Sequence, residues 1–76
     1  MELATIQDLA RLVMQGALHT LRFASDGRTA VVKYYVGGKS ASESDRMLVE
    51  KRITPTPGPD GIDRYNVKFL EFANAS

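Results

Sequence analysis

An Asp-Gly pair lies between two runs of strand-forming residues in the first half of the chain. The runs are Thr20–Ala24 and Thr29–Val36, and Asp26-Gly27 stands in the connection between them. This pattern is the strongest short-range signal for a β-hairpin, because glycine readily takes the positive φ that a tight turn requires. We therefore expect the fold to be organised around a hairpin that turns at Gly27.

The two predicted strands of this hairpin differ in polarity. In the first, which covers about residues 19–24, Leu21 and Phe23 alternate with polar side chains. The second, about residues 28–36, is bulky on both faces. Such a strand is typical of the middle of a sheet, or of a sheet whose second face has a partner. The pattern leaves open what covers that second face.

Apolar residues recur at helical spacing before the hairpin. They share one stripe at i, i+3, i+4 and i+7 intervals and are Ile6, Leu9, Ala10, Val13 and Ala17. This spacing predicts an amphipathic helix over about residues 4–15. Thr5 and Asp8 resemble a capping box with Asp in place of the usual Glu, and Gly16 is placed to end the helix.

Residues 46–54 fit two structures. As a strand, Met47 and Val49 would share one face, whereas as a helix the segment would have Ser44 as its N-cap. Pro55 follows directly, and residues before proline avoid the helical region. We therefore favour a strand over this segment.

The segment Pro55–Asp63 holds all three prolines of the chain. Proline lacks an N–H group and fixes φ, so we expect a stiff loop without regular structure here. A last strand follows over about residues 64–72. Apolar residues on both of its sides imply a bulge or a strand that is covered on both faces.

Together these elements predict a single α+β domain over residues 1–76. Its N-terminal helix would pack on a four-stranded antiparallel meander made of two hairpins, since short connections favour neighbouring antiparallel strands. The order of elements is similar to that of SH3-like and Sm-like barrels, so a curled meander would be a small barrel of that kind. Residues 5–36, a helix followed by a hairpin, also resemble the head–tail joining proteins of lambda-type phages, whereas the proline-rich second half departs from them.

Composition excludes several classes of function. The chain has 76 residues, no cysteine and a formal charge of +1. Disulfides, thiolate nucleophiles and cysteine ligands for zinc are therefore excluded, and the charge is far below that of proteins that hold nucleic acid by bulk electrostatics. No apolar run approaches the roughly 20 residues that a membrane-spanning helix needs. We expect a cytoplasmic protein that does not enter a membrane.

Candidate catalytic and metal-binding residues are few. His19 is the only histidine, and neither a cysteine nor a nucleophile-elbow motif stands near it. The serines of residues 40–44 lie in a polar run without an activating base. Asp60 and Asp63 match only a stub of a calcium loop, and turn formation explains them. We therefore expect a non-enzymatic protein with no catalytic residue, no metal site and no cofactor.

A basic face of the predicted sheet suggests one binding function. If Leu21 and Val32 face the helix, cationic side chains and a tyrosine share the opposite face. These candidate nucleic-acid contacts are Arg22, Lys33, Tyr35, Arg52 and Lys68. Several single-strand binders use such a face, because bases stack on the aromatic ring while cations meet phosphates. Nucleic-acid binding is therefore one hypothesis.

The same face carries apolar bulk that one short helix cannot cover, and the stiff proline loop would give a second contact. The resulting candidate protein interface comprises Val31, Lys33, Tyr35, Leu70, Phe72, Pro57 and Asp60. An apolar patch rimmed by cations is typical of protein interfaces. We favour a module that acts through protein–protein interaction, such as a small phage-type or accessory inhibitor, adaptor or assembly factor. Its partner would be another protein or, since small domains are hard to stabilise alone, a second copy of the chain.

Overall fold

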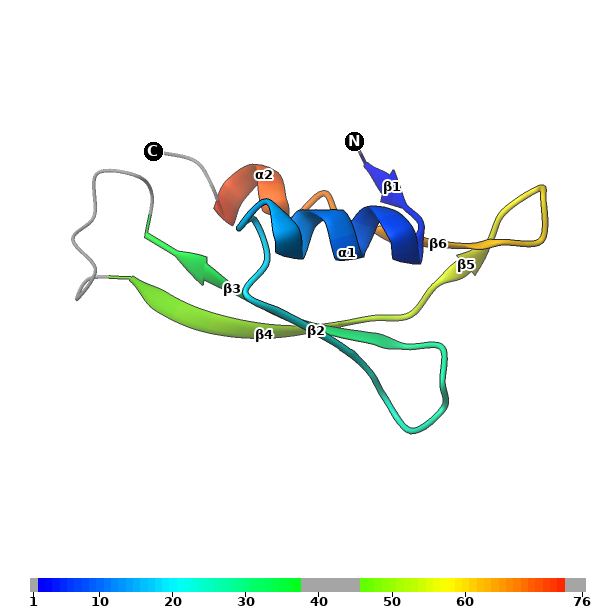
Figure 1. The fold of residues 1–76 in the computed structure, drawn as a ribbon, viewed down its shortest axis with the longest axis horizontal. Helices are drawn as coiled ribbons and strands as arrows, with labels where there is room; N and C mark the ends of the chain where they lie inside the picture. Colours follow the sequence, from blue (N-terminus) through cyan, green and yellow to red (C-terminus); the bar gives the residue numbers. More distant parts are fainter. Residues whose placement is uncertain (1, 38–45, 74–76) are drawn as a thin grey trace.

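The computed structural model describes residues 2–37 and 46–73. They form an α+β fold with two three-stranded antiparallel sheets, of strand order β2-β3-β4 and β1-β6-β5. The elements in chain order are β1 (Leu3–Ala4), α1 (Ile6–Met14), β2 (Thr20–Phe23), β3 (Ala30–Val36), β4 (Met47–Ile53), β5 (Thr56–Pro57), β6 (Asp63–Asn66) and α2 (Leu70–Ala73). Figure 1 shows both helices on the same side of the β2-β3-β4 sheet.

The helix α1 confirms the predicted amphipathic helix. The Thr5 hydroxyl accepts a hydrogen bond from the Asp8 N–H at 3.2 Å, and the Asp8 carboxylate accepts one from the Thr5 N–H at 3.0 Å, which is the predicted capping box. The chain leaves the helix through Gly16, whose φ is 82°. Leu9 is buried as predicted, but Ala10 is exposed. Neither helix of the described residues is long and apolar enough to cross a membrane.

The strands β2 and β3 form the predicted hairpin, with Leu21 opposite Val32. Gly27 has a φ of 72°, so the turn uses the conformational freedom of glycine as expected. The ambiguous segment is a strand, because every residue of β4 pairs with β3, from Val36 opposite Met47 to Ala30 opposite Ile53. The serines of residues 40–44 lie outside the described residues.

The second half of the chain departs from the predicted meander. The strand expected over residues 64–72 is instead the short strand β6, followed by a turn and α2. The Asn66 side chain accepts a hydrogen bond from the Lys68 N–H at 2.9 Å, and this Asx turn ends the strand. Moreover, β6 pairs with β1 and β5 instead of β4. The four-stranded meander and its barrel form are therefore not confirmed, since neither sheet of the described residues closes.

Two short strands have no counterpart in the sequence-based prediction. Thr56–Pro57 lies in the segment expected to be irregular, yet it pairs with β6. Proline is tolerated there because β5 is at the edge of its sheet, where a missing N–H breaks no ladder. Leu3–Ala4 pairs with β6 on its other side, and two residues are too few to show a strand period.

The core lies between α1 and the covered face of the β2-β3-β4 sheet, and it extends to β6. Its buried members are Ala4, Leu9, Leu18, Ala30, Val32, Tyr34, Ile53, Tyr65 and Val67. Leu21 and Val49 pack against it as expected. Phe23 and Met47, expected on the same face, are instead 47% and 65% exposed. They lie at strand ends, and α1, about 13 Å long, is shorter than β3 and β4, each about 23 Å.

Candidate binding site on the outer sheet face

The β2-β3-β4 sheet has one face against the helices and one face turned away from them, which we term the outer face. Val32 and Tyr34 belong to the core, so the side chains that alternate with them along β3 point to the outer face. Strand pairing then gives the members of this face as Thr20, Arg22, Val31, Lys33, Tyr35, Leu48, Glu50 and Arg52. Figure 1 shows no described helix or strand on this side of the sheet.

The first row across the outer face places a valine between two arginines. Arg22 and Arg52 are the partners of Val31 on its two neighbouring strands. Val31 is only 1% exposed, although it lies outside the core cluster between the sheet and α1. Directly opposed side chains lie about 5 Å apart at Cβ. We infer that the aliphatic stems of the two arginines cover Val31 while their charged ends remain in water.

An aromatic and an aliphatic side chain meet at the other end of the face. Tyr35 is opposite Leu48, and each is 43% exposed. The imidazole of His19 lies edge-on to the Tyr35 ring, with 5.3 Å between centroids and an interplanar angle of 66°. This contact gives His19 an aromatic neighbour at the surface. The row is an exposed apolar strip with one polar tip, the Tyr35 hydroxyl.

Positive charge dominates the outer face. The outer face carries three cations, Arg22, Lys33 and Arg52, and one carboxylate, Glu50. Its formal charge is therefore +2, whereas the whole chain carries +1. Glu50 forms a 3.7 Å ion pair with Arg22, diagonally across β3, and both side chains are about half exposed. Such exposed pairs contribute little to stability. Among the described residues, Lys33 and Arg52 form no ion pair, so their charges are available to a ligand.

The structure gathers some of the predicted site residues and separates the others. Val31, Lys33 and Tyr35 from the candidate protein interface lie on the outer face, together with Arg22 and Arg52 from the candidate nucleic-acid contacts. Both hypotheses therefore concern one surface.

The remaining predicted residues lie elsewhere. Lys68 is in the turn after β6, and Leu70 begins α2 and packs against the core, so neither shares the outer face. The expected position of Leu70 on a sheet face is wrong, because the chain turns into a helix where a continued strand was expected. Phe72 is in α2, and its side chain lies outside the described part of the structure. Pro57 is in β5 and Asp60 in the turn that follows it.

Leu48 is an outer-face residue that sequence reasoning did not select. The alternation of residues 46–54 already placed it opposite Met47 and Val49, so a signal existed. Its pairing with Tyr35 depends on the register between β3 and β4. Residues 38–45 lie in the connection between these two strands. The sequence of either strand alone does not determine how the two strands align.

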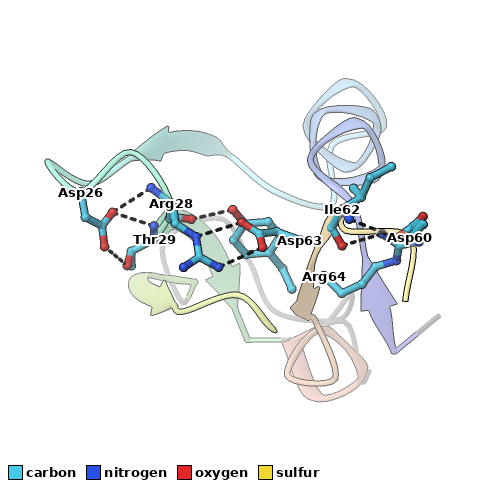
Figure 2. A network of polar contacts seen from close by, with 8 residues as sticks. Asp26, Arg28, Thr29, Asp60, Ile62, Asp63 and Arg64 are labelled. Atoms are coloured by element: carbon cyan, nitrogen blue, oxygen red, sulfur yellow. Dashed lines mark hydrogen bonds and ion pairs between the residues drawn. The ribbon is translucent and has the colours of Figure 1, made fainter. Parts of the chain in front are cut away.

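A network of polar contacts, drawn in Figure 2, holds the turn of the β2-β3 hairpin. The Asp26 carboxylate accepts hydrogen bonds from the Thr29 hydroxyl at 2.6 Å and from the N–H groups of Arg28 and Thr29, each at 2.8 Å. The Thr29 hydroxyl, followed by these N–H groups, holds the pKa of Asp26 at about 2, below its ordinary value of 3.8. The carboxylate is therefore a charged structural part of the turn.

The same turn is tied to the second sheet. The Arg28 guanidinium donates two hydrogen bonds to the Asp63 carboxylate, at 2.9 and 3.1 Å, and the Tyr65 hydroxyl donates one to the Arg28 C=O at 2.5 Å. Burial is the main cause that raises the pKa of Tyr65. These contacts fix the hairpin, and with it β3, relative to β6.

The turn between β5 and β6 has its own ion pair. Arg64 donates to the Asp60 carboxylate at 2.9 Å, and the hydrogen bonds from Arg64 and from the Ile62 N–H lower the pKa of Asp60. Asp60 and Asp63, which matched a stub of a calcium loop, are thus each paired with an arginine. Residues 2–37 and 46–73 contain no group of three or more acidic or histidine side chains arranged to hold a metal ion.

Comparison with known proteins gives no information on this site. No protein-family model matches the chain, and neither the curated proteins nor the solved structures gave a significant match. The function must therefore be argued from the outer face itself.

Proposed function

We propose that this protein is a non-enzymatic, cytoplasmic binding module whose outer face contacts another protein. One observation carries the proposal: Tyr35 and Leu48 form an exposed apolar row beside the cation Lys33, on a face that also carries Arg52 and that no described element covers. Tyrosine and arginine are favoured anchors of protein interfaces, because they combine a large contact area with directed polar groups.

The position of these side chains suits a binding surface. β3 pairs with a strand on each side, so Lys33 and Tyr35 project from the most constrained strand of the sheet. A surface of that kind loses little conformational entropy on binding, which favours affinity. Its chemistry indicates a partner that offers an apolar group to the Tyr35–Leu48 row and carboxylates to the cations.

An exposed binding face of this kind favours an accessory role. A small domain that presents such a face is suited to act as an inhibitor, an adaptor or an assembly factor, including one of phage type. Such a protein works by occupying a surface of a larger machine. The activity of that partner, measured with and without this protein, would then report on binding.

The experiment is a comparative pull-down with two single variants. Tyr35→Ala removes the ring from the outer face, whereas Met14→Ala removes an even more exposed apolar side chain from α1, since Met14 is 87% exposed and Tyr35 43%. We expect a protein captured by the natural chain and by Met14→Ala to be lost, by at least about tenfold, with Tyr35→Ala. Equal capture by both variants would contradict the proposal.

Nucleic-acid binding is the second candidate, and a specific observation favours it. Arg22, Lys33 and Arg52 lie in two adjacent rows of the outer face, beside the exposed Tyr35 ring. Affinity for a single-stranded oligonucleotide should then fall steeply with salt, and Arg22→Ala should reduce the slope by about one. Lys68→Ala is the matched control, since it removes a cation that lies off this face. Equal slopes for the two variants would remove this candidate.

A further inference from the structure

The strand β4 has a free edge. It is the last strand in the order β2-β3-β4, and each of its residues, Met47–Ile53, pairs with β3 on the opposite edge. No other described strand pairs with it. A long free edge presents unsatisfied N–H and C=O groups and is a template for pairing with another chain.

The hydrogen-bond pattern shows which residues direct their backbone groups outward. The Ala24 N–H donates to the Thr29 C=O at 2.8 Å, so these opposed residues are a hydrogen-bonded pair. Bonded and non-bonded pairs alternate along an antiparallel ladder, which makes Val31 bond towards β2 and Val32 bond towards β4. In the register of β3 and β4, the odd-numbered residues of β4 bond to β3. Leu48 and the other even-numbered residues therefore point their N–H and C=O groups to the free edge.

The beginning of β4 is also the most exposed apolar part of the sheet. Met47 is 65% exposed on one face and Leu48 is 43% exposed on the other. Natural edge strands are usually short, charged or covered. The charged residues of β4 are Glu50, Lys51 and Arg52, so its first three residues, Met47–Val49, are all apolar.

The charges on the two sides of Leu48 are opposite in sign. Arg46 lies directly before β4, two residues before Leu48, and Glu50 lies two residues after Leu48. Pairing with a second copy would extend the strand by one residue, and Arg46 would then share a face with Leu48 and Glu50. Two antiparallel copies of this segment centred on Leu48 would therefore place Arg46 of each copy opposite Glu50 of the other. The apolar residues match as well, because Met47 would stand opposite Val49 of the second copy.

We propose that the β4 edge binds a second copy of this chain, by antiparallel pairing about a twofold axis at Leu48. Twofold symmetry makes the Arg46–Glu50 pair occur twice and joins the two β2-β3-β4 sheets into one sheet. About six backbone hydrogen bonds form across the axis, through the outward groups of Arg46, Leu48 and Glu50.

Neighbouring registers are less favourable. Moving the axis to Val49 places Glu50 opposite Leu48 and Arg46 opposite Arg52. Moving it to Glu50 places two carboxylates opposite each other. Like charges directly opposed destabilise a pair of strands, so these two registers are disfavoured, whereas the register centred on Leu48 opposes unlike charges.

The dimer has a consequence for the outer face. Tyr35 is opposite Leu48 within one copy, and Leu48 would be opposite Leu48 of the second copy. The exposed row would then run without interruption from one Tyr35 to the other, with the cations of both copies beside it. A single apolar strip of twice the length would form, although the pairing itself does not depend on what this face binds.

Cysteine cross-linking tests the register, because the natural chain has no cysteine. In the proposed dimer, the two Leu48 Cα atoms lie about 5.5 Å apart, within the reach of a disulfide. We expect Leu48→Cys to form a covalent dimer on mild oxidation. Arg52→Cys is the matched control on the same face of the same strand, where the two copies would be about 27 Å apart and should not cross-link. Equal cross-linking of the two variants would overturn the register.

A charge exchange tests the contacts. Sedimentation equilibrium should show that Glu50→Arg weakens the dimer by about tenfold or more, since it makes two like-charged pairs. Adding Arg46→Glu to the same chain should restore the dimer to within about threefold of the natural affinity. Arg22→Ala, which breaks the ion pair of Glu50 within one copy, should leave the dimer unchanged. A natural chain that stays monomeric at high concentration, or a double variant that fails to recover while still folded, would overturn the proposal.

Discussion

Tyr35 and Leu48 face each other across β3 and β4 on the side of the sheet away from the helices, and 43% of each remains exposed. Neither side chain contributes to the hydrophobic core. A small domain gains stability by burying such residues, and their exposure is the observation on which the proposed interaction rests. This row, together with the arginines and the lysine beside it, is the basis of the proposed function.

The arginine stems that cover Val31 give a first prediction. Arg52→Ala removes the stem and the charge, and it should lower the free energy of unfolding by about 1 kcal/mol because Val31 becomes exposed. Arg52→Met keeps most of the stem and should lose less than half of that. Urea denaturation measures both values. An equal loss in the two variants would mean that the charge, not the stem, is responsible.

The hydrogen bond between the two sheets gives a second prediction. Tyr65→Phe removes the hydroxyl that donates to the Arg28 C=O, at a site where Tyr65 is 1% exposed. Loss of a hydrogen bond at this part-buried site should cost about 1 kcal/mol of stability. Tyr35→Phe is the control, since its hydroxyl is at the surface, and it should change stability by less than about 0.5 kcal/mol. Similar losses in both variants would argue against a structural role for this bond.

The helix cap, the hairpin turn and the strand alternation could be predicted from the sequence because their causes are local. The capping box of Thr5 and Asp8 needs only a spacing of three residues, and the turn at Gly27 needs only one residue with positive φ. The strand alternation of β2, β3 and β4 has the same local origin. These are the parts of the fold, and of the outer face, that the sequence predicted correctly.

The parts that were predicted wrongly depend on distant pairing. β6 pairs with β1, close to the N-terminus, and the Val67 N–H donates to the Glu2 C=O at 2.8 Å. Nothing near residue 67 indicates that partner. A strand continued through residue 72 would carry Leu70 to the outer face. The turn at Asn66 redirects the chain, and Leu70 packs on the core instead.

A third prediction concerns pH. The pKa of Asp26 is about 2 in the folded protein, below the ordinary value of 3.8 that the unfolded chain has. The folded state therefore favours the charged carboxylate, so its stabilising contribution is complete above about pH 4 and is lost as the pH falls towards 2. Asp8 and Asp60, whose pKa values are also lowered, act in the same direction.

Thermal melts between pH 2 and 5 test this expectation. The melting temperature should fall as the pH decreases through that range. In Asp26→Asn, which keeps an oxygen acceptor for the turn but cannot titrate, the decrease should be smaller. An identical pH profile for this variant would show that Asp26 does not stabilise the folded state through its charge.

A fourth prediction concerns the hairpin turn. Gly27 has a φ of 72°, and a Cβ added there would meet no atom within 4 Å, so only backbone strain opposes a side chain. Gly27→Ala should therefore destabilise the protein by about 1 kcal/mol. Gly27→Asn should lose less, because asparagine tolerates the left-handed region. Chemical denaturation gives the comparison, and a larger loss for Asn than for Ala would contradict a purely conformational cause.

The central claim is that the outer face binds a protein partner. The most direct measurement is quantitative capture of partners by three immobilised forms of the chain: the natural protein, Tyr35→Ala and Met14→Ala. We predict that at least one protein binds the natural chain and Met14→Ala equally, and binds Tyr35→Ala at least about tenfold less. If every captured protein binds Tyr35→Ala as well as it binds Met14→Ala, the outer face is not the contact surface.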